Sequence, residues 1–329
     1  MIYTEEFQKY IKSPAFLEPL GLDAAPDFTL LGQGEYNINY AFDHSDGRKL
    51  VLRINRGSQM HLDNQISYEF SALKALEPSG RTPKALFCDS AHHCLVMEHL
   101  PGRPLRYETD LETAAEIFAD IHALPPVPGL IEPENPLEAI IDECRQMVRH
   151  YYEWDQADPE VVRLLKTLET EIAAKDRSAP MGIRKCIVNT EVNSGNFLIN
   201  PGAQSYLIDW EKPLISEPAQ DLGHFLVPTT TFWKTDVILT PEEIRHFVRC
   251  YIQAVDGRFE TGSLSERLPL YFTVTCLRGV TWCAMAYREY CQPGRAIANP
   301  DTFEKLKAYL DPAFLRNLLE NYVRKDFLA

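Results

Sequence analysis

IVNTEVNSGNFLINPGAQSYLIDWE, from Ile187 to Glu211, places a polar loop between two groups of apolar residues. Its first residues end a short apolar strand, and the polar segment NTEVNSGN cannot continue a core element. FLI and YLI are two β-prone runs, and the turn-forming residues Asn200-Pro201-Gly202 join them. The sequence therefore predicts a polar loop that leads into a hairpin, with Asp209 at the end of that hairpin.

The polar side chains of this stretch favour a catalytic and metal-binding loop. Glu191 and Asn196 are five residues apart, which is the spacing of the base and the metal-holding amide in a kinase catalytic loop. Carboxylate and amide oxygens are suitable ligands for Mg²⁺. We therefore predict that Glu191, Asn196 and Asp209 are catalytic, and that Asn196 and Asp209 hold the metal. The alternative is a solvated hairpin with incidental acids, since such loops are common.

The same stretch resembles the aminoglycoside phosphotransferase and choline kinase family, small-molecule kinases with a protein-kinase-like fold. Asn196-Phe197-Leu198 and Ile208-Asp209-Trp210-Glu211 match the two ends of the family's pattern. Two positions depart from it, because Asn189 stands where the family has His and Glu191 where it has the catalytic Asp. The resemblance extends over most of the chain, roughly residues 25–320.

An antiparallel sheet is predicted near the start of the chain. In residues 28–55, strand-like runs flank a first turn with two glycines, and Asp46-Gly47 marks a second hairpin turn. Gly32 and Gly34 would let backbone N–H groups approach a phosphate closely. Asn37 occupies the third glycine position of a kinase loop, and the pattern resembles the choline kinase type of loop. A plain turn is the alternative.

A strand cation and a helix carboxylate follow in the order of a kinase N-lobe. Arg53, in the strand-like run KLVLRI, stands where protein kinases have a phosphate-binding Lys. Glu69 adjoins the apolar stripe of an amphipathic helix predicted within residues 63–76. The resemblance implies that Glu69 pairs with Arg53. The alternative is that both are ordinary surface charges.

The segment CLVMEHLPG resembles the hinge between the two lobes of the family. The resemblance implies that Met97 lines an adenine pocket and that backbone groups from Glu98 to Leu100 bind the adenine edge. The side chain of Glu98 then needs no function, since a solvated hinge is the default. Pro101-Gly102 is a break after the hinge.

The remainder of the chain is predicted to be mainly helical, with amphipathic patterns from Leu111 onward. Asp221 matches the family's Asp before Leu, whose implied role is to brace the catalytic loop. The resemblance also implies that the last helices build the pocket for the phosphate acceptor. Trp282, Tyr287 and Tyr290 are candidates for stacking on a cation, although aromatic residues at helical spacing more often belong to the core.

Composition restricts the partners. A formal net charge of −14 argues against nucleic acid and against an anionic membrane surface, and it is compatible with a cationic small molecule. The eight cysteines are scattered singly, which favours a reducing, cytoplasmic compartment over a disulfide framework. The first residues lack the pattern of a signal peptide, and the apolar run from Leu270 to Tyr287 favours a buried helix rather than a membrane span.

These observations predict an α+β, two-lobed protein-kinase-like fold. Residues 1–100 would form a small antiparallel β-rich N-lobe that binds nucleotide phosphates, and residues 101–329 a larger, mainly helical C-lobe with the catalytic loop and acceptor pocket. The expected function is ATP- and Mg²⁺-dependent phosphorylation of a hydroxyl group on a small molecule, such as an aminoglycoside, choline or a sugar-like acceptor.

The departures at Asn189 and Glu191 leave an alternative: a nucleotide-binding regulatory protein of the same fold with impaired catalysis. A protein kinase is less favoured because no DFG and APE pair brackets an activation segment. The identity of the acceptor, the choice between ATP and GTP, and the oligomeric state are left open by the sequence.

Overall fold

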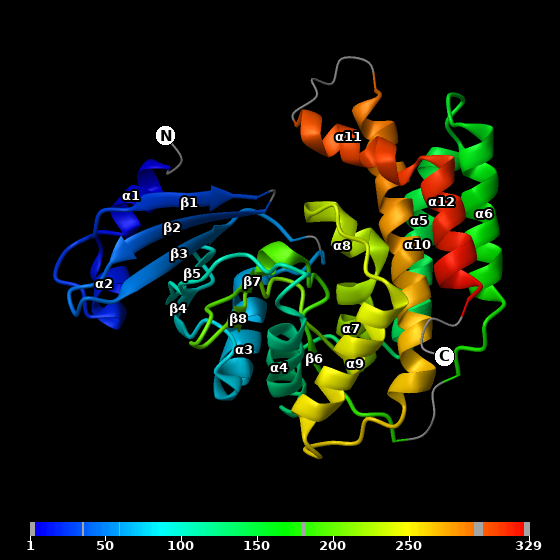
Figure 1. Cartoon of the computed structure of the whole chain (residues 1–329). Helices are drawn as coiled ribbons and strands as arrows, with labels where there is room; N and C mark the ends of the chain where they lie inside the picture. Colours follow the sequence, from blue (N-terminus) through cyan, green and yellow to red (C-terminus); the bar gives the residue numbers. More distant parts are fainter. Residues whose placement is uncertain (1–3, 35, 59, 179–181, 293–298, 326–329) are drawn as a thin grey trace.

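The protein has two lobes that meet at the central hairpin (Figure 1). The structure is a computed structural model and describes residues 4–34, 36–58, 60–178, 182–292 and 299–325. The smaller lobe contains a five-stranded sheet, and the larger lobe consists mainly of helices. The predicted α+β, two-lobed architecture is therefore confirmed.

The N-lobe is an antiparallel sheet with helices on both sides. Its strand order is β1-β2-β3-β5-β4, and every neighbouring pair is antiparallel. Its elements are α1 (Glu5–Tyr10), α2 (Pro14–Leu20), β1 (Thr29–Gln33), β2 (Asn37–Asp43), β3 (Lys49–Asn55), α3 (Gln65–Leu76), the short 3₁₀ helix η1 (Glu77–Ser79), β4 (Ala85–Asp89) and β5 (Cys94–Glu98).

Alternation along β3 directs side chains to two separate cores. Leu50 and Leu52 face α1 and α2 and join a cluster with Phe16. Val51 faces the opposite way and belongs to the main cluster, which includes residues of α3. Arg53 lies two residues beyond Val51, so it emerges on the α3 side of the sheet, where the two lobes meet.

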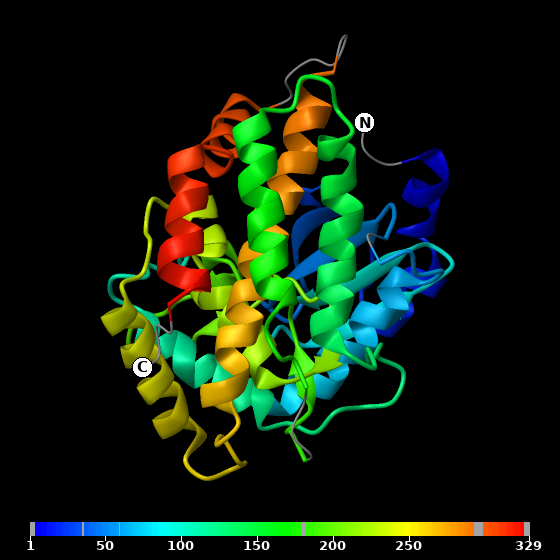
Figure 2. The same cartoon turned by 90° about the vertical axis from the view of Figure 1, so that its right-hand side faces the viewer.

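The C-lobe is built around the long helix α10 (Leu264–Tyr290). Figure 2 shows α5, α6, α10 and α12 running side by side. The other C-lobe elements are α4 (Leu111–His122), α5 (Pro136–Tyr152), α6 (Pro159–Ala173), α7 (Pro218–Leu226), α8 (Pro228–Lys234), α9 (Pro241–Val255), α11 (Pro300–Tyr309), α12 (Pro312–Leu318) and a π-helical turn η3 (Leu319–Val323). Within the described residues, no helix is both long and apolar enough to cross a membrane.

Two small sheets carry the loop between the lobes. The predicted hairpin is formed by β7 (Phe197–Leu198) and β8 (Tyr206–Leu207), preceded by the short 3₁₀ helix η2 (Ser194–Asn196). The predicted strand before the loop is β6 (Cys186–Val188). It pairs with β9 (Leu214–Ser216), a strand that the sequence patterns did not indicate.

A glycine lets the linker between the lobes run against the hairpin. A Cβ atom on Gly102 would lie 2.7 Å from the Cβ of Leu198, and the φ angle of Gly102 is 143°. Arg103 then pairs with Ile199 as an isolated bridge. Only glycine combines this backbone angle with so close an approach, so the break predicted at Pro101-Gly102 fixes the linker on β7.

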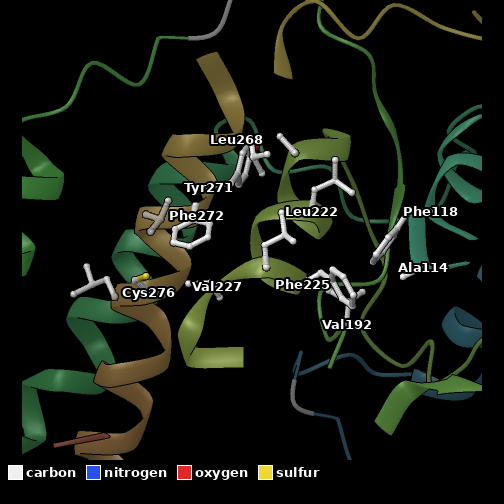
Figure 3. Close-up of a cluster of buried hydrophobic side chains, with 14 of the residues drawn as sticks. Ala114, Phe118, Val192, Leu222, Phe225, Val227, Leu268, Tyr271, Phe272 and Cys276 are labelled. Carbon is white, nitrogen blue, oxygen red and sulfur yellow. The ribbon is translucent and has the colours of Figure 1, made fainter. Parts of the chain in front are cut away.

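The hydrophobic core reaches directly beneath the catalytic loop (Figure 3). Val192, the residue after Glu191, is buried with Phe118 of α4 and with Leu222 and Phe225 of α7. Phe225 and Phe118 pack edge to face at 5.4 Å between ring centroids. An apolar side chain immediately next to Glu191 therefore anchors the loop.

Two details of the N-lobe differ from the sequence expectation. Gly32 lies within β1 rather than on the turn, and Asn37 is the first residue of β2 with 7% exposure. The φ angle of Asn37 is not positive, so its backbone has the ordinary extended conformation of a strand. Because Asn37 belongs to the ladder, its side chain is directed at neighbouring side chains rather than at a turn.

Candidate active site

The loop before the hairpin is braced from below by Asp221. Its two carboxylate oxygens accept hydrogen bonds from the backbone N–H groups of Asn189 at 2.8 Å and Thr190 at 2.9 Å. Asp221 is fully buried in the first turn of α7. The sequence expectation that Asp221 supports the loop rather than reacting agrees with these contacts.

Asn189 ties this loop to the end of the hairpin. Its side-chain amide donates to the backbone oxygen of Asp209 at 2.9 Å, and its amide oxygen accepts from the N–H of Glu191 at 3.0 Å. Both polar atoms of the Asn189 side chain therefore link the loop before the hairpin to the end of the hairpin. This bridging geometry is a physical reason for an asparagine to function there.

Two residues of the site have left-handed backbones. Thr190 has a φ angle of 68° and Asp209 one of 65°, and this region is unfavourable for a β-branched residue such as threonine. The hydroxyl of Thr190 donates to the backbone oxygen of Lys212 at 2.8 Å. Together with the bonds to Asp221, this contact holds the strained segment in place.

Glu191 is paired with a lysine that the sequence analysis did not single out. Lys212, only 7% exposed, donates from its ammonium group to Oε1 of Glu191. No other side-chain contact of Glu191 is described, so Oε2 remains available. The side-chain amide of Asn196 donates to the backbone oxygen of Glu191 at 2.7 Å, which fixes the spacing between these two residues.

Three carboxylates converge at the end of the hairpin. Glu191, Asp209 and Glu211 each have an oxygen within 4.8 Å of the other two. Burial, together with the negative charges of Asp209 and Glu191, raises the pKa of Glu211 to about 7. Its side chain accepts a hydrogen bond from the amide of Asn37, and its backbone oxygen accepts one from Gln65 at 2.5 Å.

This donor set fits magnesium. Clustered carboxylates repel each other unless a cation or a proton neutralises them, and the raised pKa of Glu211 reflects that cost. Hard oxygen ligands suit Mg²⁺. Asn196 uses its amide nitrogen in the bond to Glu191, so its amide oxygen is left as a ligand beside Asp209.

Arg53 and Glu69 form the predicted pair at the N-lobe side of the cluster. Nη1 of Arg53 lies 2.5 Å from a carboxylate oxygen of Glu69, and Nη2 lies 3.3 Å from Asp209. Asn39 accepts from Nε at 3.0 Å. Burial opposes the charge on Arg53, but the carboxylates of Glu69 and Asp209 outweigh burial and raise the pKa of the guanidinium above its usual value.

A cavity of about 290 Å³ opens between the lobes next to Arg53. Its apolar lining includes Leu31, Val51, Met97, Leu198 and Ile208, and Glu98 and Leu100 lie at its edge. We call this cavity the slot between the lobes; its apolar side chains could pack against the faces of a planar base. An adjoining cavity of about 390 Å³ is lined by Gly32, Gly34, Asn37, Arg53, Glu191, Asp209 and Glu211.

Two of the three backbone N–H groups from Glu98 to Leu100 already donate hydrogen bonds within the N-lobe. The N–H of Glu98 donates to Lys84 at 3.0 Å, and the N–H of His99 donates to Lys49 at 3.1 Å. In the described part of the chain, the N–H of Leu100 has no such partner. Of the three hinge residues expected to bind a base edge, Leu100 therefore offers the free donor.

A further cavity, of about 580 Å³, lies on the other side of Asp209. We call it the acceptor pocket. Glu191, Asn196 and Asp209 form one wall, and residues of α7, α8, α10 and α11 form the rest. Burial, followed by the positive charges of Arg278 and Lys212, lowers the pKa of His224 in this wall to about 3, so its ring is neutral at physiological pH.

Close packing of α8 on α10 shapes this pocket. A Cβ atom on Gly279 would lie 2.4 Å from the Cβ of Thr229, so a larger residue at position 279 would push α8 away. Trp282 lines the pocket as the sequence suggested. Tyr287 and Tyr290 instead stack on Phe303, with ring centroids 5.5 and 5.7 Å apart, and do not line the pocket.

The structure brings the predicted site residues together from both lobes around Asp209. Sequence reasoning missed Glu211 and Lys212 as members of the site. Glu211 was detectable, because it is the second acid of the quoted Asp209-Trp210-Glu211 segment. No sequence pattern pointed to Lys212. Its role depends on a contact with Glu191, a residue 21 positions earlier in the chain, that only the folded structure forms.

Comparisons with known proteins agree with this geometry. A sequence model of the phosphotransferase enzyme family matches residues 27–257 of the chain. The matched region includes β1 to β5, the loop with Glu191, and the hairpin that ends at Asp209.

Solved structures of similar fold cover nearly the whole chain. A choline/ethanolamine kinase family protein from Mesorhizobium loti superposes with a TM-score of 0.60 at 18% identity, covering 97% of this chain and 98% of that one. A macrolide 2′-phosphotransferase from Brachybacterium faecium gives 0.59 at 16% identity, covering 94% and 99%. A spectinomycin phosphotransferase, solved with ADP and spectinomycin, gives 0.59 at 16% identity, covering 98% and 97%.

Proposed function

Because the chain belongs to the phosphotransferase enzyme family, we propose that it transfers the terminal phosphoryl group of ATP to a hydroxyl group of a small molecule, with Mg²⁺ as cofactor. The observation that carries this proposal is the position of Asp209. It lines the slot between the lobes, the adjoining cavity beside Arg53, and the acceptor pocket. A phosphoryl group at this point would lie between donor and acceptor.

On the nucleotide side, the base would occupy the slot lined by Val51 and Met97, with the free N–H of Leu100 as donor. Arg53 would contact the phosphates, since its guanidinium lines the cavity between Gly32 and Asp209. Glu69 would position Arg53 through their ion pair. Phosphoryl transfer depends mainly on such positioning and on charge stabilisation.

On the acceptor side, Oε2 of Glu191 would orient the acceptor hydroxyl and take its proton. Lys212 holds the other carboxylate oxygen of Glu191. This contact would restrict the glutamate side chain and so compensate for its extra methylene relative to aspartate. Asp209, Asn196 and Glu211 would hold magnesium. When bound, the ion neutralises negative charge on the phosphate oxygens.

A second function remains specific enough to test: nucleotide binding without turnover. The ion pair between Lys212 and Glu191 favours this function. The ammonium group of Lys212 already interacts with the carboxylate of Glu191 and competes with the proton that the acceptor hydroxyl would give up. Both functions require MgATP binding, and only the first requires acceptor-dependent release of ADP.

The deciding experiment measures binding and turnover separately. Calorimetry with ATP, with and without Mg²⁺, is expected to show magnesium-dependent binding that Asp209→Asn weakens, because this change removes an anionic ligand. A screen of sugars, amino alcohols and aminoglycosides then tests for ADP release above background. Absence of ATP binding in either condition would contradict both functions, and binding without acceptor-dependent turnover would leave only the second.

A further inference from the structure

The charge of the acceptor pocket narrows the class of acceptor. We infer that the acceptor carries an anionic group, a carboxylate or a phosphate, in addition to the hydroxyl group that is phosphorylated. This inference rests on the proposed function and concerns the wall of the pocket that faces Glu191 and Asp209. It departs from the cationic acceptor with which the overall charge of −14 is compatible.

Both carboxylates that line the acceptor pocket, among the described residues, belong to the catalytic segments. They are Glu191 and Asp209, and the proposed function commits them to the acceptor hydroxyl and to magnesium. The other charged residues in the lining are Lys234 at the end of α8 and Arg278 in the middle of α10. A cationic acceptor would need a further carboxylate on this wall, and none of the lining residues supplies it.

Arg278 has a counter-ion, but that counter-ion lies outside the pocket. Glu143 of α5 accepts from Nε at 2.9 Å and from Nη2 at 3.2 Å. Glu143 lines only a smaller neighbouring cavity of about 190 Å³, whereas Arg278 lines both cavities. The pair therefore fixes the guanidinium in position. Among the residues that the structure describes, no hydrogen bond from Nη1 is found, so Nη1 can donate to an anion in the acceptor pocket.

Lys234 is the more accessible cation. It is exposed, and no ion pair involving it is found among the described residues. Its neighbour Trp233 packs edge to face against Trp282, with ring centroids 5.2 Å apart. The pocket thus offers partly exposed indole surfaces next to a lysine ammonium and an arginine fork. A ring-shaped hydroxyl compound with one anionic substituent matches both features.

The test uses four pyranoses of similar size that differ in charge: glucose, glucosamine, glucuronate and glucose 6-phosphate. Binding to the full chain, loaded with ADP and Mg²⁺, is measured by calorimetry. We expect at least one anionic sugar to bind about tenfold more tightly than glucose, and glucosamine to bind most weakly, because two nearby cations act on the ligand. Comparing glucuronate with glucose 6-phosphate separates a carboxylate site from a phosphate site.

Two variants identify the responsible side chains. Lys234→Glu is expected to raise the Kd or KM for the anionic sugar about tenfold and to leave kcat nearly unchanged, because Lys234 does not touch the reacting atoms. Arg278→Gln should have the same direction of effect. Lys12→Glu, which reverses the charge of an exposed lysine in the N-lobe, is the matched control and should change neither constant.

The results that would overturn the inference are distinct from failure of the proposed function. Binding of glucosamine at least as tight as that of the anionic sugars, binding by none of the four, or an unchanged preference in Lys234→Glu would each contradict an anionic acceptor. If the unmodified protein binds MgATP in separate calorimetry, and Asp209→Asn weakens that binding, the proposed phosphotransferase function would still stand. Loss of MgATP binding in the unmodified protein would instead reject the proposed function itself.

Discussion

The cavities on the two sides of Asp209 are lined by opposite members of two ion pairs. On the proposed nucleotide side the cation of the pair faces the cavity and its carboxylate partner is more deeply buried. On the proposed acceptor side the carboxylate faces the cavity and its cation partner is more deeply buried. Arg53 lines the cavity beside the glycines and is held by Glu69, which is 1% exposed. Glu191 lines the acceptor pocket and is held by Lys212, which lines only the smaller cavity behind it. In the proposed function, Arg53 would face the phosphates and Glu191 the acceptor hydroxyl.

The two pairs also differ in burial. The side chains of Arg53 and Glu69 are 7% and 1% exposed, whereas that of Glu191 is 28% exposed. A buried pair has few alternative geometries, and removal of one partner leaves an uncompensated charge in the interior. A partly exposed pair can exchange its partner for water or for a ligand hydroxyl. We therefore expect the nucleotide side to be rigid and the acceptor side to be adaptable.

The comparison predicts that the largest catalytic loss comes from the acceptor-side carboxylate. Glu191→Gln should lower acceptor-dependent ADP release about 10²–10⁴-fold, the usual contribution of a general base, and should leave ATP affinity nearly unchanged. Steady-state kinetics and calorimetry measure the two effects. Equal turnover in the unmodified protein and the variant would remove Glu191 from the mechanism. Glu191→Asp sharpens the test, since a site adapted to glutamate and Lys212 should lose activity.

Breaking the buried pair should instead affect stability. Glu69→Gln leaves Arg53 with Asp209, at 3.3 Å, as its anionic partner and removes the shorter contact, so we expect the free energy of unfolding to fall by about 2 kcal/mol. Urea denaturation measures this loss. Glu77→Gln, at the exposed end of the same helix region, is the control and should cost less than about 0.5 kcal/mol. A loss at Glu69 no larger than that of the control would show that the pair does not hold Arg53.

Removing the cation behind Glu191 should have a smaller effect on turnover than removing Glu191 itself. Lys212→Met keeps the backbone oxygen that accepts from Thr190 but releases the carboxylate. We expect kcat to fall about tenfold, because even displacement by about 1 Å costs up to roughly 10²-fold, with recovery in Lys212→Arg. A rise in kcat would mean that Lys212 restrains Glu191 rather than positions it.

The smallest expected effect concerns pH, because a carboxyl group whose pKa is raised on folding destabilises the folded state once it ionises. The pKa of Glu211 rises from its ordinary value of 4.5 to about 7, mainly through burial. The contribution of the protonated Glu211 side chain to the free energy of unfolding is therefore fully present below pH 4.5 and is lost as the pH rises through 7. In EDTA, the Tm difference between the protein and Glu211→Gln should change by on the order of 2 °C between pH 6 and pH 8.

Magnesium provides the control for this last prediction. An ion bound by the carboxylate cluster should offset the loss above pH 7, since it neutralises the charge that burial disfavours. Thermal shift with added Mg²⁺ at both pH values measures the compensation. A stabilising effect of Mg²⁺ that is as large at pH 6 as at pH 8 would place the ion away from Glu211.

Much of the nucleotide side was predictable because its pieces occur in a fixed order along the chain. Arg53 and Glu69 meet because antiparallel pairing fixes β3 in the sheet and the apolar stripe of α3 packs beneath it. The hairpin that ends at Asp209 follows from two β-prone runs around an Asn-Pro-Gly turn. Local patterns of periodicity and turn chemistry are sufficient for such elements.

The acceptor side was not predictable in the same way. Lys212 meets Glu191, and Arg278 reaches the pocket with its counter-ion behind it, only because segments distant in the chain pack together. Asn37 was expected on a turn but lies in β2, where its amide contacts Glu211. The sequence by itself indicated the two-lobed fold, through motifs that resemble a known family, and the order of the predicted site segments, because both can be read from residues along the chain. The tertiary structure decided which charge faces each ligand, because that depends on contacts between residues tens to hundreds of positions apart.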